Sequence, residues 1–307
     1  MIRFNHITQL NKIMTKNQYT LGFIGIGLMG KPMTLRLLDA GFKVNVWNRS
    51  KEKLHAVTEA GAIACPTIEA LSKVSDIIIL CLANTDVVKS VVNNHIAQAK
   101  TQAKLLIDLS SIHPETSKEL ARHLQQQNNI SWVDAPVSGG TAGAEQGTLA
   151  IMAGGSEADI EIARIVLKPL YKQLTHMGGI GSGQVTKICN QMIVSCNVMV
   201  IAEMMALAKT AGVDTSKIPQ ALAGGFADSK PLQIVGPEMA SETFEPIKWH
   251  VKTLLKDLNM AVDLSIDQNN SIPLSGLAAQ LMQLHANQGY LDQDPATLIK
   301  LFKQADA

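Results

Sequence analysis

The sequence predicts an α/β protein in which a doubly wound, mainly parallel sheet domain is followed by an all-α domain. In the first half, short apolar runs alternate with helix-like segments, which is typical of a parallel sheet covered by helices on both faces. In the second half only helical patterns continue, and a glycine-rich tract at 178–183 separates the two halves. We therefore expect an N-terminal extension over residues 1–19, a sheet domain over 20–180 and a helical domain over 181–307.

The expected strands of the first domain are apolar runs bounded by turn residues. In the strand expected at 76–82, all residues after Asp76 are apolar, as in a parallel strand buried on both faces. The expected strands lie at 20–24, 44–47, 76–82, 105–109, 132–133, 149–153 and 174–176. Between them, helical spacing predicts helices at 28–40, 51–60, 67–74, 85–94 and 116–127.

After the glycine-rich tract, helical patterns dominate. A single long helix is expected over 184–211, ending at Gly212, and it would join the two domains. Further helices are expected at 217–223, 247–268 and 273–287, with Gly and Pro turns between them. Because no further strand–helix–strand unit appears, this half is expected to be all-helical.

The composition excludes several classes of protein. The 27 Lys and Arg nearly balance the 26 Asp and Glu, so no basic excess indicates a nucleic-acid or anionic-membrane partner. The four cysteines are too few for a disulfide scaffold and show no metal-ligand spacing, so free thiols and no metal are expected. The longest apolar stretch, 193–208, is interrupted by polar residues, and 1–19 lacks the apolar core of a secretory signal. We therefore expect a cytoplasmic protein without a membrane span.

A glycine motif follows the first expected strand and opens the first expected helix. Gly25, Gly27 and Gly30 form GxGxxG inside a strand–helix–strand unit, which is the context of a dinucleotide-binding turn. Gly25 permits the tight turn, Gly27 lets the backbone approach a pyrophosphate, and Gly30 lets the helix pack closely. With Leu28 and Met29, this turn is expected to present backbone N–H groups to the cofactor phosphates.

The end of the second expected strand bears on the choice of cofactor. An acidic residue there would bind the ribose 2′-hydroxyl of NAD, but this chain has Asn48, Arg49 and Ser50 instead. Arg49 can form a charge-assisted pair with a 2′-phosphate, and Ser50 can add a hydrogen bond. The sequence therefore favours NADP, with NAD remaining possible.

Four sequence blocks resemble the β-hydroxyacid dehydrogenases, the family that includes 3-hydroxyisobutyrate dehydrogenase. They are GFIGIGLMGKPM at 22–33, DAPVSGG at 134–140, Gly183 with Lys187 and Asn190-Gln191, and KDL at 256–258. The resemblance extends from about residue 21 to 302. It implies a Rossmann domain joined by a long helix to an all-helical domain, and a homodimer or homotetramer.

The resemblance also assigns chemical roles. It implies that Lys187 is the catalytic acid/base, donating a proton to a substrate carbonyl or accepting the hydroxyl proton in the reverse direction. This lysine lies one turn into the long helix, directly after the glycine-rich tract and therefore at the expected interdomain cleft.

Two further groups of residues are expected to bind the substrate. The backbone and hydroxyl of Ser138, Gly139 and Gly140 are implied to hold its carboxylate. The amides of Asn190 and Gln191 lie on the lysine's helix face and can hold its other oxygens. Many relatives have Asn-Asn here, so the Asn-Gln of this chain favours tartronate semialdehyde over 3-hydroxyisobutyrate as substrate.

The remaining expected cofactor contacts follow from the resemblance. Leu82 and Ala83 end the strand at 76–82, and relatives usually have proline where this chain has Ala83. Ser110 resembles a residue near the nicotinamide ribose, and Lys256 resembles a lysine that reaches the cofactor. For Asp257, we weigh an orienting role on the catalytic lysine against a role in helix packing and favour packing.

Together these features predict an NADP-preferring oxidoreductase that interconverts a small β-hydroxy acid and its semialdehyde. The first expected reaction is reduction of tartronate semialdehyde to glycerate, followed by reduction of glyoxylate or succinic semialdehyde, and then oxidation of 3-hydroxyisobutyrate. An NADPH-binding protein without catalysis is the alternative from another class, and the presence of Lys187 argues against it. A 6-phosphogluconate-type decarboxylating enzyme would need a longer helical half.

Overall fold

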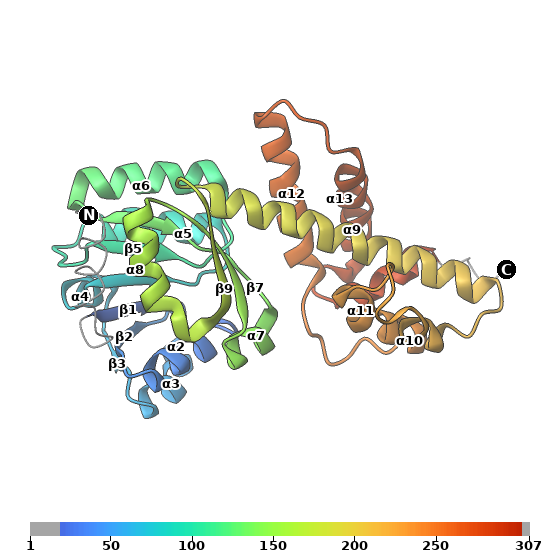
Figure 1. Cartoon of the computed structure of the whole chain (residues 1–307), viewed down its shortest axis with the longest axis horizontal. Coiled ribbons are helices and arrows are strands. Elements are labelled where there is room, and N and C mark those ends of the chain that lie inside the picture. Colours follow the sequence, from blue (N-terminus) through green and yellow to red (C-terminus); the bar gives the residue numbers. More distant parts are fainter. Residues whose placement is uncertain (1–18, 303–307) are drawn as a thin grey trace, which may run out of the picture. The chain divides into compact units, whose positions relative to one another are not determined.

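The computed structural model describes residues 19–302 and divides into two compact units (Figure 1). Unit 1 ends at Lys187 and unit 2 begins at Ile188, so the division falls within the long helix α9 (Ser182–Thr210). Nearly all of the expected extension at 1–19 lies outside the described residues. The two units are described separately below.

Unit 1 is built on a nine-stranded sheet with the order β3-β2-β1-β4-β5-β6-β8-β7, with β9 beside β8. The neighbours from β3 to β6 are parallel, and β8 is antiparallel to β6 and β7 but parallel to β9. The expected doubly wound, mainly parallel sheet is therefore confirmed. Its strands are β1 (Thr20–Ile24), β2 (Lys43–Trp47), β3 (Ile63–Ala64), β4 (Ile77–Leu80), β5 (Leu105–Asp108), β6 (Ser131–Asp134), β7 (Val137–Ser138), β8 (Leu149–Gly154) and β9 (Tyr171–Gly178).

Both faces of this sheet carry apolar side chains that are buried under the covering helices. Along β4, Ile77 and Ile79 belong to one core cluster, whereas Ile78 and Leu80 belong to another. This alternation follows from the period of two in a β-strand and explains the continuous apolar run in the sequence. The covering helices are α2 (Gly30–Asp39), α3 (His55–Glu59), α4 (Ile68–Lys73), α5 (Thr85–Val91), α6 (Pro114–Asn128), α7 (Gly140–Gln146) and α8 (Glu157–Leu167).

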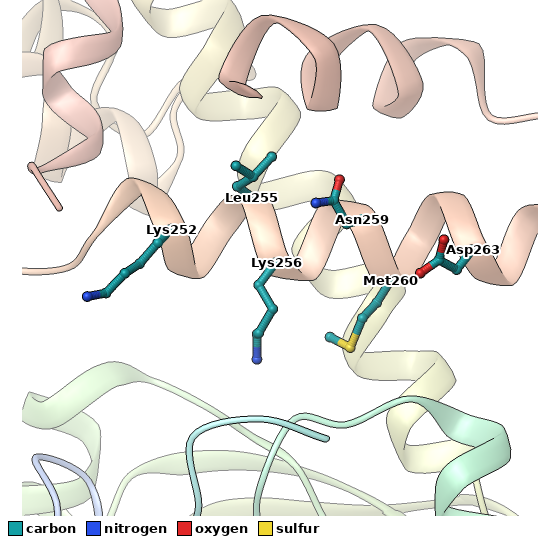
Figure 2. A pocket seen from close by; sticks show the side chains of 6 residues that line it. All are labelled: Lys252, Leu255, Lys256, Asn259, Met260 and Asp263. Carbon is teal, nitrogen blue, oxygen red and sulfur yellow. The ribbon is translucent and has the colours of Figure 1, made fainter. Parts of the chain in front are cut away.

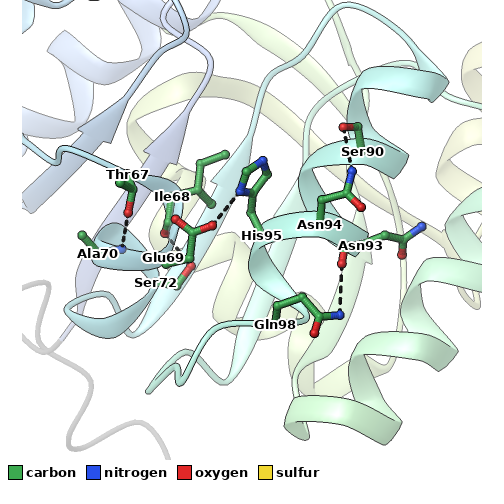
Figure 3. A network of polar contacts seen from close by, with 10 residues as sticks. All are labelled: Thr67, Ile68, Glu69, Ala70, Ser72, Ser90, Asn93, Asn94, His95 and Gln98. Atoms are coloured by element: carbon green, nitrogen blue, oxygen red, sulfur yellow. Dashed lines mark hydrogen bonds and ion pairs between the residues drawn. The ribbon is translucent and has the colours of Figure 1, made fainter.

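Polar contacts tie α4 to the π-helical turn η3 (Val92–Ile96) that extends α5 (Figure 3). Glu69 lies 2.6 Å from His95 Nδ1. Burial is the largest single influence and raises the pKa of Glu69, but hydrogen bonds with His95, with Thr67 and with its own backbone, together with the charge of His95, leave that pKa below its usual range. Thr67 begins α4 by accepting a hydrogen bond from the Ala70 N–H at 3.1 Å, as the expected helix start at this threonine requires.

Unit 2 is helical around its own apolar core, which confirms the expected all-α half. Alongside α9 it contains α10 (Ile218–Leu222), α11 (Lys230–Ser241), α12 (Val251–Asp267), α13 (Pro273–His285) and the 3₁₀ segment η7 (Pro295–Phe302). By length and composition α9 could cross a membrane, a test that core helices of soluble proteins also pass. Several α9 side chains, among them Val198, Ala202 and Met205, are buried in the core of unit 2.

Candidate functional site

The GxGxxG turn between β1 and α2 can be made only with glycine at two positions. Gly25 has a φ of 105°, and a Cβ there would lie 2.2 Å from the carbonyl oxygen of Cys81. A Cβ on Gly30 would lie 1.9 Å from the carbonyl oxygen of Gly25. The tight turn and the close helix packing expected from the motif are therefore present in the structure.

Gly27 differs, because a Cβ at this position would meet no atom within 4 Å. Packing within the protein therefore does not require glycine at position 27. Close approach of a ligand to the backbone would require it. The first turn of α2 contains no acidic residue, so nothing opposes an anion at this helix end. Leu28 is 80% exposed beside the turn, and Met29 is half-buried. The turn fits the phosphates of a dinucleotide.

The segment after β2 is tied to the glycine turn. Asn48 Oδ1 accepts the N–H of Ile26 at 2.9 Å, and Asn48 Nδ2 donates to the carbonyl of Ser50 at 2.8 Å. Asn48 thus fixes the loop that carries Arg49. Arg49 is exposed, and its guanidinium makes no hydrogen bond or ion pair within residues 19–302. It can therefore pair with an added phosphate.

The carboxyl ends of β4 and β5 bring two expected cofactor residues together. Ser110 Oγ accepts the N–H of Leu82 at 2.9 Å, and the Ser110 N–H donates to Asp108 Oδ1 at 2.9 Å. Ala83 follows Leu82 and is exposed. These strand ends lie on the same edge of the sheet as the glycine turn, where the strand order reverses between β1 and β4. Open α/β sheets bind nucleotides at this reversal point.

The Ser138-Gly139-Gly140 segment leads from a short strand into a helix. Ser138 pairs with Ala150 of β8, and α7 begins at Gly140. Gly139 has a φ of 141° and Gly140 a φ of 64°. Both values are conformations that side-chain-bearing residues rarely adopt, so this turn depends on its two glycines.

On α9, the residues expected to bind substrate form a hydrogen-bonded series. Asn190 Nδ2 donates to Gln191 Oε1 at 2.8 Å, and Gln191 Nε2 donates to Asp257 Oδ2 at 2.5 Å. Gln191 and Asp257 are buried, while Asn190 is half-buried. This arrangement makes Gln191 a support that orients the Asn190 amide, and Asn190 is the better placed of the two to contact a ligand. Lys187, one turn earlier, is half-buried.

Asp257 also contacts its neighbour on α12. Its Oδ1 lies 3.2 Å from Lys256 Nζ, so one buried carboxylate links Lys256 to Gln191. Lys256 lines a shallow pocket of about 400 Å³. Figure 2 shows the Lys256 side chain pointing from α12 in the same direction as that of Met260. The six lining residues all come from α12 and are Lys252, Leu255, Lys256, Asn259, Met260 and Asp263. Lys256 belongs to unit 2, whereas the glycine turn belongs to unit 1.

Three buried polar residues of unit 1 were not singled out from the sequence. Asp108 and Asp134 end neighbouring strands and face each other in register, and Gln184 lies in the first turn of α9. Burial raises the pKa of Asp108 to about 7 against its hydrogen bonds from Ser110, and burial likewise raises the pKa of Asp134 to about 7. Asp134 sits in the DAPVSGG block, but only the fold shows what it contacts. Within residues 19–302, no cluster of His, Cys, Asp or Glu has the makeup of a metal site.

We expect the stability of unit 1 to fall as pH rises from about 4 to 7. The pKa of Asp108, about 7 when folded, lies above its unfolded value near ~3.9, so folding favours the protonated acid. Asp108→Asn keeps the acceptor for the Ser110 N–H without the charge. It should raise the melting temperature at pH 8 by at least about 2 °C and have little effect at pH 4.

Thermal unfolding followed by circular dichroism between pH 4 and 8 checks this expectation. The matched control is Asp86→Asn, which neutralises an exposed acid of the same unit. Equal effects of Asp108→Asn at both ends of this range would show that burial does not hold the Asp108 proton.

Family models match both halves of the chain. One describes the NAD binding domain of 6-phosphogluconate dehydrogenase and matches residues 20–179. The other describes the NAD-binding region of NADP-dependent 3-hydroxyisobutyrate dehydrogenase and matches residues 181–302.

Individual proteins are similar over almost the whole chain. The 2-hydroxy-3-oxopropionate reductase of Escherichia coli strain K12 is 35% identical over 282 residues, which are 91% of this chain and 96% of that protein. The 2-(hydroxymethyl)glutarate dehydrogenase of Eubacterium barkeri is 31% identical over 286 residues, with 92% and 95% covered. Among solved structures, 3-hydroxyisobutyrate dehydrogenase of Mycobacterium tuberculosis with L-serine has a TM-score of 0.83 at 27% identity, covering 93% of this chain and 99% of that one.

Proposed function

This chain belongs to the family of β-hydroxyacid dehydrogenases that includes 3-hydroxyisobutyrate dehydrogenase, and we propose that it reduces tartronate semialdehyde to glycerate with NADPH. Tartronate semialdehyde is another name for 2-hydroxy-3-oxopropionate, the substrate in the name of the Escherichia coli relative. The observation that carries the proposal is the Asn190-Gln191 pair, whose second amide is held by Asp257. With Gln191 committed to that contact, Asn190 is the amide of the pair left to meet a small polar substrate.

The residues of this chain divide the work of the reaction. A nicotinamide dinucleotide supplies the hydride when it is bound. We assign Lys187 to donate a proton to the aldehyde oxygen as that oxygen gains charge, and Asn190 to hold the same substrate by its amide. The serine hydroxyl and backbone N–H groups of Ser138-Gly139-Gly140 are assigned to the carboxylate. Gly27 admits the cofactor phosphates, while Leu82 and Ser110 form the adjoining wall at the ends of β4 and β5.

The preference for NADP rests on Arg49. Its exposed guanidinium lies on a loop that Asn48 fixes, and no acidic residue stands at the end of β2 to repel a 2′-phosphate. The family model that matches residues 181–302 is described by an NADP-dependent 3-hydroxyisobutyrate dehydrogenase, which supports the same cofactor. Oxidation of 3-hydroxyisobutyrate is the second candidate reaction, because that acid names both the C-terminal family model and the Mycobacterium tuberculosis structure.

Initial rates of NADPH and NADH absorbance loss test this proposal. The panel is tartronate semialdehyde, glyoxylate, succinic semialdehyde and methylmalonate semialdehyde, the last being the oxidised partner of 3-hydroxyisobutyrate. We expect tartronate semialdehyde to have the highest kcat/KM and NADPH to outperform NADH. A clear preference for methylmalonate semialdehyde would assign the second reaction instead.

Arg49→Ala provides the cofactor test. A lost charge-assisted hydrogen bond of ~1.5–3 kcal/mol should raise the KM for NADPH by roughly 10- to 100-fold, while the KM for NADH stays within about twofold. Arg122→Ala is the matched control, since Arg122 is an exposed arginine of the same unit, on α6. Equal changes in both KM values would show that Arg49 does not read the 2′-phosphate.

We further propose that the chain forms a homodimer or homotetramer. An exposed apolar stripe runs along α9 at seven-residue spacing, where Ile193 is 70%, Val200 54% and Leu207 72% exposed. Such a stripe is the kind of helix surface that packs against another helix, and a second copy of the chain would supply one. Light scattering should then give a mass of two or four chains, and a mass of one chain would contradict the proposal.

A further inference from the structure

Gln184 is enclosed within unit 1 at the start of α9, and both ends of its amide are bound. Its side chain is 1% exposed. Gln184 Oε1 accepts the N–H of Ile112 at 3.1 Å, and Gln184 Nε2 donates to the carbonyl of Ser110 at 2.8 Å. Both partners belong to the segment that follows β5. One buried side chain therefore joins the first turn of α9 to this segment.

The same turn is held a second time from β6. The carboxylate of Asp134 accepts the N–H of Gly181 at 2.7 Å through Oδ1 and the N–H of Gln184 at 2.9 Å through Oδ2. The first N–H groups of a helix have no partner within it, so this carboxylate satisfies donors that burial would otherwise leave unpaired. A Cβ on Gly183 would lie 2.4 Å from the Met152 carbonyl oxygen, so the turn packs directly on β8. The start of α9 is thus fixed to the sheet.

The segment after β5 also reaches the neighbouring strand end. Ser110 Oγ accepts the N–H of Leu82, which follows β4. A hydrogen-bonded path therefore runs from Leu82 through Ser110 to Gln184. Lys187 lies three residues after Gln184 and shares its helix face. The path links the wall assigned to the cofactor with the helix turn that carries the assigned proton donor.

We infer that Gln184 is a positioning residue that sets the placement of Lys187 relative to the cofactor wall at Leu82 and Ser110. The inference rests on the proposed function. An amide suits this position because it offers an acceptor to Ile112 and a donor to Ser110 without adding a charge beside the buried Asp134. Losing it would leave a buried N–H and a buried carbonyl without their partner and free the α9 turn to shift. A displacement of ~1 Å at a reacting group can lower a rate by about 10²-fold.

Gln184→Met tests the inference, because methionine has a similar length and volume but no amide. We expect kcat with tartronate semialdehyde and NADPH to fall by about 10- to 100-fold, with the KM for NADPH within about threefold of the wild type. The matched control is Leu124→Ala, which truncates a fully buried side chain of α6 outside the path. It should lower the melting temperature at least as much as Gln184→Met while leaving kcat within about twofold.

A second measurement does not depend on turnover. By hydrogen exchange, the wild type should gain protection at residues 182–189 when NADPH binds, because the path transmits the ordering of the cofactor wall to α9. In Gln184→Met, protection should persist at the glycine turn and be lost at 182–189. The Ile112 N–H should also exchange faster in this variant without any cofactor.

The two proposals fail in different ways. If the wild type turns over none of the four aldehydes, the proposed function is wrong, and the exchange experiment still decides the role of Gln184. If the wild type is active and Gln184→Met keeps its kcat and the coupled protection, the positioning role is wrong. A loss of kcat matched by Leu124→Ala at equal melting temperature would likewise reduce Gln184 to a structural residue.

Discussion

Lys187→Ala is expected to lower kcat/KM for tartronate semialdehyde by about 10³-fold while the affinity for NADPH stays within about threefold. Proton transfer by a positioned side chain contributes about 10²- to 10⁴-fold, and alanine offers neither a proton nor a charge to the aldehyde oxygen. Initial rates of NADPH absorbance loss give the first quantity. Isothermal titration calorimetry with NADPH gives the second and shows that the variant is folded.

Lys187→Arg separates the charge from the proton. Arginine keeps the positive charge but does not give up its proton near neutral pH, so this variant should also lose most of the activity. Lys209→Ala is the matched control on the same helix, where Lys209 pairs with Glu242 at 2.6 Å at the far end of α9. An exposed ion pair contributes at most about 1 kcal/mol, so this variant should keep its kinetics.

Activity that survives in Lys187→Ala would remove the lysine from the acid/base role. If Lys187→Arg remained active and Lys187→Ala did not, Lys187 would contribute by stabilising charge on the substrate oxygen rather than by donating a proton. Either outcome would leave the family membership of the chain intact, because that rests on similarity over almost the whole sequence.

Local patterns were sufficient to predict the parallel half of the sheet and the glycine turn. The apolar runs of β1, β2, β4 and β5 end at turn residues, and the strand–helix alternation predicts that they form a parallel sheet. The glycine turn could be predicted because its spacing is visible in the sequence. In the structure, a Cβ at Gly25 or Gly30 would clash with nearby backbone atoms, so both positions require glycine. These features depend on residues close together in the chain, which is why the sequence reveals them.

Other elements escaped prediction for physical reasons. Helix α8 was missed although Ser156 caps it by accepting the Asp159 N–H at 3.2 Å, a start signal visible in the sequence. Helix α11 begins in the same way at Ser229 and also contains Pro237, which argues against a helix by composition alone. The two-residue strands β3 and β7 are too short to produce a period.

The supporting contacts of the site could not be predicted because they join distant segments. Gln191 and Asp257 are 66 positions apart, and Gln184 and Ser110 are 74 apart. Asp257 was expected to serve helix packing, and its buried contacts with Gln191 and Lys256 show that it also orders side chains assigned to the site. Only the folded chain reveals which polar residues hold the ones that meet a ligand.

Gly27→Ala is expected to weaken NADPH binding by roughly 10- to 100-fold without lowering the melting temperature. A methyl group on Gly27 meets no protein atom within 4 Å, so the fold can accept it. The same methyl group would occupy the space through which the pyrophosphate approaches the backbone, and inserting a methyl into a close contact costs ~1–3 kcal/mol. Calorimetry with NADPH and thermal unfolding of the free protein measure the two effects.

Gly30→Ala is the matched contrast, because it adds the same methyl group three residues away. There the Cβ would lie 1.9 Å from the Gly25 carbonyl oxygen, so the turn itself must distort and the melting temperature should fall by several degrees. If Gly27→Ala bound NADPH as tightly as the wild type, the phosphates would have to lie elsewhere than against this turn. The same substitution at two glycines of one motif is thus expected to have different effects: Gly30→Ala destabilises the fold, whereas Gly27→Ala weakens cofactor binding.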